Sequence, residues 1–189
     1  MNRRFFLTLL GAYAVRTSAG TGADEDADED ADEDKSGLSA NELIQFTPIS
    51  EGVSRASALV LYEGLPHPFW EAEKFKRELA TKKTVRFHDY PFYERPLHVA
   101  AEEIGSLRRL SAAADSYWSY GGPKFCGAYH PDYCLAWKGD AATYDLLICF
   151  GCGEMKLYGA ERMLVVDVRR DTFRQFETTL KKYRNQRPS

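Results

Sequence analysis

The stretch of sequence that decides the fold runs from Asp132 to Val168 and reads DYCLAWKGDAATYDLLICFGCGEMKLYGAERMLVVDV. It contains four strand-like runs, rich in leucine, valine and aromatic residues: Asp132 to Trp137, Thr143 to Cys149, Glu154 to Tyr158 and Met163 to Val168. Glycine-containing turns separate the runs, as in successive β-hairpins. This stretch therefore predicts an antiparallel β-meander.

Helices are predicted on both sides of the meander along the chain. Apolar residues recur at helical spacing from Pro68 to about Ala80, and again from about Leu97 to Ala113. After the meander, Asp171 is expected to cap a final amphipathic helix. The apolar face of that helix would consist of Phe173, Phe176, Leu180 and Tyr183.

Two more strands are expected upstream, at Ala56 to Tyr62 and Thr84 to Phe87, whereas two prolines predict that His88 to Pro96 is irregular. The fold class is therefore α+β. We expect a small antiparallel meander with about three helices packed on it.

The first 37 residues have the character of export and linker sequence. Residues 1–19 combine Arg3 and Arg4 with a short apolar run, which is typical of a signal segment and resembles a twin-arginine export signal. Residues 20–37 contain the tetrad Ala-Asp-Glu-Asp three times, which predicts a disordered acidic linker. We therefore expect an exported protein, periplasmic or secreted, with one domain over residues 38–189 and no stable membrane span in the mature chain.

The charge balance argues against nucleic acid as a partner. The first 34 residues hold three of the chain's 25 basic residues and nine of its 28 acidic residues, which leaves 22 and 19 for the remainder. This excess of about three positive charges is too small for a phosphate-binding surface, and no basic stripe interleaved with aromatic residues is present. The physiological partner stays unknown at this stage.

The most informative motif lies inside the meander, at Cys149-Phe-Gly-Cys152-Gly. A C-x-x-C-G turn suits soft metals, because two thiolates leave one tight loop and the glycine can take a positive φ. The hairpin before it should pair residues whose numbers sum to roughly 279 to 281. Such a register places His130 within two positions of Cys149 or opposite Gly151.

Cys126 lies a short loop before His130 and is expected to fold back toward the turn. The expected metal site is therefore Cys126, His130, Cys149 and Cys152, a zinc-knuckle-like Cys₃His shell for a structural zinc ion. Cys134 should lie opposite one of the residues 145–147 and act as a buried bystander.

Other interpretations of the cysteines stay open. Exported proteins meet oxidants, so Cys126–Cys134 and Cys149–Cys152 are a plausible disulfide pairing, and unpaired core thiols are another possibility. A thiol–disulfide redox protein would use Cys149 and Cys152, although the residues that follow alternate like a strand and offer no helix dipole to activate a thiol. A metal-handling protein would keep an open coordination position, where Met155 would favour copper.

The remaining histidines have weaker claims to chemistry. His67 lies between two prolines and is expected to cap a turn, and His88 beside Asp89 is expected to be a satisfied polar residue under a loop. No nucleophile with both an orienting group and an oxyanion donor is identifiable. Catalytic residues are therefore unknown, and an enzyme is not favoured.

Several motifs together resemble those of one protein family. They are Leu61–Pro68 (LYEGLPHP), His88–Tyr93 (HDYPFY), Cys126–Tyr133 (CGAYHPDY) and Ile148–Cys152 (ICFGC). The chain is similar in these segments to a family of short, often exported bacterial proteins of the planctomycete type, to which no activity is assigned. The resemblance implies no catalytic residue, and the expected function is a non-enzymatic binding or structural module.

Overall fold

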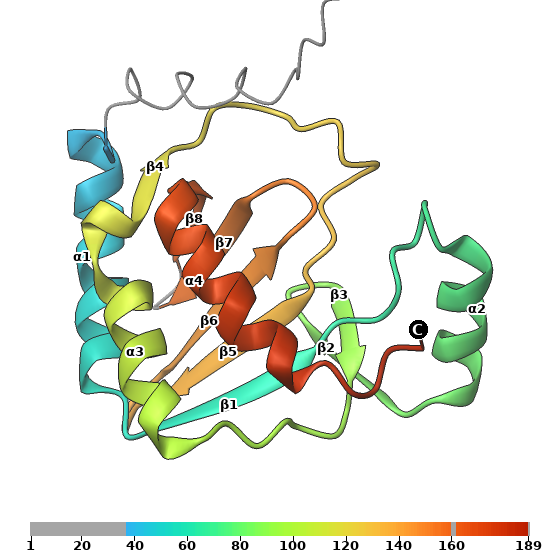
Figure 1. The fold of residues 1–189 in the computed structure, drawn as a ribbon. Helices are drawn as coiled ribbons and strands as arrows, with labels where there is room; N and C mark the ends of the chain where they lie inside the picture. Colours follow the sequence, from blue (N-terminus) through green and yellow to red (C-terminus); the bar gives the residue numbers. More distant parts are fainter. Residues whose placement is uncertain (1–36, 160–161, 189) are drawn as a thin grey trace, which may run out of the picture. The chain divides into compact units, whose positions relative to one another are not determined.

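The computed structural model describes residues 37–159 and 162–188, which belong to the compact unit Lys35–Ser189. The predicted signal segment, and the predicted linker apart from Gly37, lie outside the described residues. The described elements follow in chain order (Figure 1): α1 (Ala40–Arg55), β1 (Ala58–Glu63), α2 (Ala72–Thr81), β2 (Thr84–Phe87), β3 (Tyr90–Tyr93), α3 (Ala101–Ala112), η2 (Ala114–Ser116), β4 (Tyr117–Ser119), β5 (Tyr133–Lys138), β6 (Thr143–Cys149), β7 (Glu154–Gly159), β8 (Arg162–Val168), α4 (Arg170–Leu180) and η3 (Lys181–Tyr183).

The main sheet has six antiparallel strands in the order β1-β5-β6-β7-β8-β4. Strands β5 to β8 form the predicted meander, and β1 and β4 extend it at its two edges. In the β5–β6 hairpin Trp137 faces Tyr144 and Cys134 faces Leu147, so opposing residue numbers sum to 281. This register is the upper end of the predicted range, and the α+β class is confirmed.

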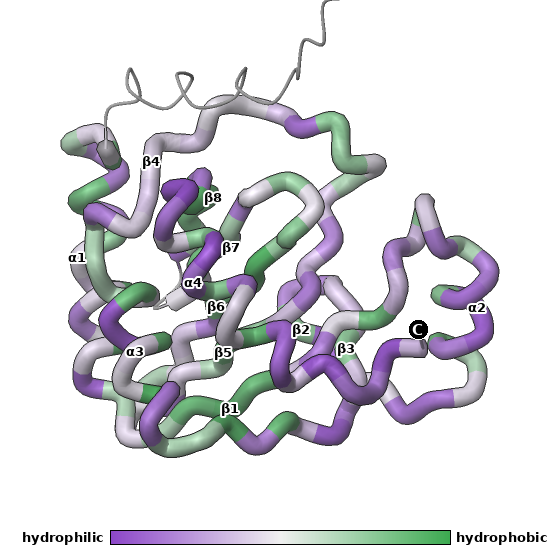
Figure 2. Tube along the Cα trace, viewed as in Figure 1, coloured by the Kyte–Doolittle hydropathy of each residue, from purple (hydrophilic) through white to green (hydrophobic). Residues whose placement is uncertain are grey.

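Helices α1, α3 and α4 cover one face of the main sheet (Figure 1). Alternate residues of β5, namely Tyr133, Leu135 and Trp137, pack in this core against side chains such as Leu107 of α3 and Phe176 of α4. Burial of each such side chain contributes about 1.5–3 kcal/mol relative to exposure. The tube in Figure 2 is hydrophobic along much of β1 and β7 and hydrophilic over most of α2, whose one buried residue is Glu78.

The small β2–β3 hairpin covers part of the opposite face of the main sheet. Phe92 of β3 forms a second buried cluster with Cys134 of β5 and Leu147 of β6. The hairpin turn has two residues, His88 and Asp89, with φ values of +48° and +72°. Positive φ at both residues is typical of the type I′ turn, whose backbone twist matches that of the flanking strands.

Helix α1 is a feature that the sequence analysis does not predict. Three helices cover the main sheet, as expected, and they are α1, α3 and α4. The predicted helix α2 is not among them. Pro48 and Gly52 interrupt the helical pattern within α1. A capping box stabilises its first turn: the Ser39 hydroxyl accepts the Glu42 N–H, and the Glu42 carboxylate accepts the Ser39 N–H.

Two local expectations are wrong. Strand β3 lies inside the segment that was expected to be irregular, and it tolerates Pro91 because its sheet has only two strands and each is an edge. Arg169, not Asp171, is the N-cap residue of α4, and Asp171 lies in the first turn of that helix. There its carboxylate is still well placed for the helix dipole.

Candidate metal centre

Three of the four cysteines meet at one end of the main sheet. Cys149 is the last residue of β6, Cys152 lies in the β6–β7 turn, and Cys126 lies in the long segment between β4 and β5. Their three sulfur atoms lie within 4.8 Å of one another. Two parts of the chain that are more than twenty residues apart therefore contribute thiols to one group.

The β6–β7 turn is held by its backbone. The Gly153 N–H donates to the Cys149 carbonyl at 3.1 Å, and Gly153 has a φ of +64°, which a residue with a side chain adopts only at a cost. The Asp132 carboxylate, at the start of β5, accepts the Phe150 N–H at 2.7 Å. The turn is thus fixed from both sides.

The Cys126 segment is held by contacts with the loop before α2. The Trp70 indole N–H donates to the Cys126 carbonyl at 2.9 Å. Gly127 has a φ of +78°, and a Cβ at this position would lie 2.8 Å from the same indole nitrogen, so only glycine allows this approach. Ala128 also has a positive φ, +117°, and a conformation of this kind costs about 1–3 kcal/mol. The hydrogen bond from Trp70 therefore fixes the position of Cys126, although the backbone two residues later, at Ala128, is strained.

Cys149 and Cys152 differ in acidity. The Cys152 side chain donates a hydrogen bond to the Cys149 sulfur, and together with backbone N–H donors from His130 and Cys152 this lowers the pKa of Cys149 to about 7 despite burial. The pKa of Cys152 is raised, first by its hydrogen bond to Cys149 and then by burial. Burial raises the pKa of Cys134 well above its usual value. Cys149 is thus more acidic than Cys152, and it is buried, with 1 % of its surface exposed.

His130 does not join the group in the way that the sequence predicts. Its backbone lies beside the turn, as the register requires, and its N–H donates to the Cys149 sulfur. Its imidazole turns away, with Nε2 at 2.6 Å from the Leu65 carbonyl and the ring 4.9 Å from that of His67. Burial is the main cause that lowers the pKa of His130 to about 4, so its ring is neutral. Of the predicted Cys₃His set, the structure brings together the three cysteines only.

The structure also shows where two other candidate residues, Cys134 and Met155, lie. Cys134 is fully buried under the β2–β3 hairpin, as predicted, and all four cysteines are free thiols, so the Cys126–Cys134 disulfide is not present. Met155 packs in the helix-covered core, where its sulfur accepts from the Tyr117 hydroxyl at 3.7 Å. It is therefore no ligand in this arrangement.

His67 caps the turn that precedes α2, as expected. Its Nδ1 accepts the backbone N–H groups of Phe69 and Trp70, each at 3.1 Å. The neutral ring must then carry its proton on Nε2, which is buried without a hydrogen-bond partner in the described structure. Because Nδ1 is occupied as an acceptor, His67 is poorly suited to bind a metal through Nε2.

Sequence reasoning missed Asp132 and Trp70, the residues that hold the two halves of the group. Both lie within or beside the distinctive motifs, but their role depends on contacts across more than fifteen residues. A polar residue at the start of a strand and an exposed tryptophan give no local signal of such contacts.

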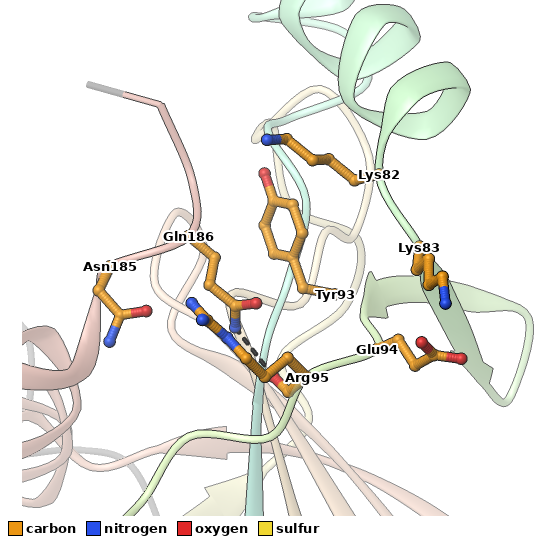
Figure 3. Close-up of a pocket in the computed structure, with 7 residues that line it drawn as sticks. All are labelled: Lys82, Lys83, Tyr93, Glu94, Arg95, Asn185 and Gln186. Carbon is orange, nitrogen blue, oxygen red and sulfur yellow. Dashed lines mark hydrogen bonds between the residues drawn. The ribbon is translucent and has the colours of Figure 1, made fainter.

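The larger hollows of the described surface lie apart from the cysteines. One of about 400 Å³ is lined by Lys82, Lys83, Tyr93 and Arg95 together with the segment Asn185–Gln186 (Figure 3). The Gln186 amide crosses it to donate to the Arg95 carbonyl at 3.0 Å, and the Tyr93 hydroxyl donates to buried Glu78 at 3.0 Å. Its hydrogen-bonding groups are thus partly used within the protein.

No helix in the described part of the chain has the length and apolar character needed to cross a membrane. Comparison of the chain with protein-family models, with curated proteins and with solved structures finds no match. The candidate site therefore rests on its own geometry.

Proposed function

We propose that Cys126, Cys149 and Cys152 bind one zinc ion, and that the protein is an exported, non-enzymatic binding or structural module stabilised by that ion. The convergence of the three sulfurs carries the proposal. In this role the metal would join the Cys126 part of the β4–β5 segment to the β6–β7 turn, in addition to the hydrogen bonds that Asp132 already makes with Ile148 and Phe150.

The spacing of the sulfurs supports metal binding. Zinc–sulfur bonds of about 2.3 Å in a tetrahedral shell place sulfurs about 3.8 Å apart. The three sulfurs here lie within 4.8 Å of one another, so a contraction of about 1 Å at most completes the geometry. Backbone N–H groups that donate to the Cys149 sulfur are the outer-shell contacts that orient thiolate ligands.

The fourth coordination position goes to water or to a ligand from solution, because the group contains no fourth Cys, His, Asp or Glu among the described residues. His130 is the reserve candidate. Its Nε2 donates to the Leu65 carbonyl, which leaves Nδ1 as the lone-pair nitrogen, the tautomer that metal-binding histidines adopt. Its ring would have to rotate toward the sulfurs to bind.

The test is metal content and thiol reactivity of the full chain, purified without chelator. We expect one zinc per chain by elemental mass spectrometry, and protection of three thiols from a thiol reagent until a chelator is added. Cys126→Ser and Cys152→Ser should each abolish stoichiometric zinc and lower the melting temperature. Cys134→Ala is the matched control, since it removes a thiol outside the group. Zinc content that is equally low in the parent and in both serine variants would refute the proposal.

A thiol–disulfide redox function is the second candidate, because the pKa of Cys149 is about 7 and Cys152 lies beside it. Two features argue against it. The acidic sulfur is buried, so an external disulfide would not reach it easily, and the motif joins two strands instead of beginning a helix. Catalysis of insulin reduction that is lost in Cys149→Ser would favour the redox function over the metal site.

Export is part of the same proposal and rests on residues 1–19 and on the resemblance described above. Fractionation of cells that express the full chain tests it directly. Replacement of Arg3 and Arg4 by lysine should retain the protein in the cytoplasm if the twin-arginine route is used.

A further inference from the structure

The segment that follows η3, residues 185–187, is bound to the main sheet through its backbone. Its three consecutive N–H groups all donate to the Glu63 carboxylate, from Asn185 at 3.2 Å, Gln186 at 2.8 Å and Arg187 at 3.2 Å. Glu63 is the last residue of β1 and is 1 % exposed. A buried carboxylate needs hydrogen-bond donors, so this contact fixes the segment at the end of β1.

The Arg187 side chain extends from this anchor toward the cysteine turn. It is 5 % exposed, and its Nε and Nη2 donate to the Gly64 carbonyl at 3.2 Å and 3.1 Å. Its Nη1 donates to one Asp132 oxygen at 2.9 Å, and the other oxygen accepts the Phe150 N–H at 2.7 Å. Phe150 follows Cys149 directly, so two hydrogen bonds in series connect Arg187 to the backbone of the turn.

The same contacts reach the Cys149 sulfur by a second route. Gly64, whose carbonyl Arg187 binds, is followed by Leu65, and the Leu65 carbonyl lies 2.6 Å from Nε2 of His130. The His130 N–H in turn donates to the Cys149 sulfur. Arg187 therefore contacts both of the stretches that support the turn.

We propose that residues 185–187 form a latch that sets the metal affinity of Cys126, Cys149 and Cys152, with Arg187 as its positioning residue. This inference rests on the zinc site proposed above and concerns the regulation of that site. A turn that the latch already holds loses less conformational entropy when it binds the ion. With the latch open, the ion itself must order the turn, and it binds more weakly.

The competing explanation is a strap that stabilises the fold and has no effect on the metal. Both explanations predict a lower melting temperature without Arg187, because the Asp132 carboxylate would lose its buried partner. They differ in the zinc affinity of the folded protein. Outer-shell residues typically change metal affinity by about 10- to 100-fold. Arg187 acts through Asp132 and not on a ligand directly, so we expect the lower end of this range.

The test is the zinc affinity of the full chain, measured under reducing conditions by competition with a chromophoric chelator. Arg187→Gln should bind zinc about 10-fold more weakly than the parent. Arg187→Lys keeps a point charge for Asp132 but not the planar fork, so its affinity should lie between the two. Arg184→Gln is the matched control, since it removes the same charge from an exposed residue nearby and should leave the affinity unchanged. All variants are compared at a temperature at which circular dichroism shows them to be folded.

A double variant tests whether the latch acts through Asp132. Asp132→Ala with Arg187→Gln should bind zinc about as weakly as Asp132→Ala alone, because both changes break the same link. Losses of affinity that add in full would overturn positioning of the turn by Arg187.

A second readout follows from linkage, because the coupling between two binding events is reciprocal. If the closed latch tightens zinc binding about 10-fold, saturating zinc favours the closed latch by the same factor. Amide hydrogen exchange at the three N–H groups that Glu63 accepts should then slow about 10-fold with zinc in the parent, and much less in Asp132→Ala. The Leu43 N–H, in the first turn of α1, should exchange at the same rate with and without zinc.

The outcomes separate the latch from the zinc site itself. Equal zinc affinity in the parent, Arg187→Gln and Arg187→Lys would overturn the latch and leave the zinc site standing, and a lower melting temperature of Arg187→Gln would then identify a strap. A parent chain that binds no zinc would overturn both proposals.

Discussion

Asp132 offers the sharpest test of how the cysteine turn is held, because its carboxylate links two parts of the chain. One oxygen accepts the Phe150 N–H at 2.7 Å and the other accepts Arg187 Nη1 at 2.9 Å. The Arg187 side chain is 5 % exposed and that of Asp132 is 16 % exposed. Asp132→Ala would therefore leave a buried guanidinium without its counter-charge and a turn N–H without an acceptor.

The expected loss is about 3–5 kcal/mol, which is typical when one partner of a buried ion pair is removed. Arg187 keeps its two hydrogen bonds to the Gly64 carbonyl, which favours the lower part of this range. For a domain of this size each kcal/mol lowers the melting temperature by about 2–4 °C, so the shift should be roughly 6–20 °C. Asp132→Asn keeps an acceptor oxygen but loses the charge, and should fall between the parent and Asp132→Ala.

Urea denaturation followed by far-ultraviolet circular dichroism measures these free energies. Asp115→Ala is the control, since Asp115 is exposed and should change stability by less than about 0.5 kcal/mol. In the double variant with Arg187→Gln, the loss should be about 1–3 kcal/mol smaller than the sum of the single losses, because the two side chains share one interaction. Full additivity, or an Asp132→Ala variant as stable as the control, would refute the reasoning.

The remaining predictions concern local backbone and charge. In urea denaturation, Gly52→Ala in α1 should destabilise the protein by about 1–3 kcal/mol, because the new Cβ would lie 1.9 Å from the Tyr144 ring. Gly105→Ala, on the exposed side of α3, should instead stabilise the protein by about 0.5–1 kcal/mol. Gly153→Ala should cost about 1 kcal/mol in a thermal melt through its φ of +64° alone, since no atom lies within 4 Å of the new Cβ. Burial raises the pKa of Glu42, but hydrogen bonds from two serine side chains outweigh it and lower the pKa below 4.5. The resulting stabilisation is fully present above pH 4.5 and is lost as the pH falls through the lowered pKa of Glu42. When the pH of a urea denaturation series is lowered from 4.5 through this pKa, Glu42→Gln should therefore lose less stability than the parent.

The meander could be predicted from sequence because its signals are local. Strand-forming residues alternate with glycine turns, and a tight hairpin fixes the register of its strands. Helix α1 could not be predicted in this way, because Pro48 and Gly52 interrupt the helical spacing of its apolar residues. Its stability comes instead from packing, since Phe46, Ile49 and Val53 are buried in the core under the sheet. Tertiary contacts of this kind override weak local preference.

The candidate metal site shows the same division between backbone and side chain. The β5–β6 ladder ends at the pair Tyr133–Ile148, so the register does not itself pair His130 with Gly151; beyond the ladder, the His130 N–H donates to the Cys149 sulfur. The imidazole was expected to follow its backbone and does not, because the Leu65 carbonyl, sixty-five residues earlier in the chain, accepts its Nε2 proton. Strand register constrains backbone donors across a hairpin but leaves the rotamer of a residue beyond the strand end free.

Because the backbone and the ring of His130 act separately, an experiment can show whether the ring joins the cysteines as a metal ligand. A metal ion with three thiolates would gain a fourth ligand only if the ring gave up its hydrogen bond to the Leu65 carbonyl, a neutral bond worth about 0.5–1.5 kcal/mol net. A zinc–imidazole bond is far stronger than that, so rotation would depend on whether the packing around the ring permits it. His130→Ala retains the backbone donor to Cys149 and removes only the ring. If this variant binds zinc as tightly as the parent, His130 acts through its backbone alone, and a large loss of affinity with unchanged metal-free stability would show that the imidazole rotates to bind.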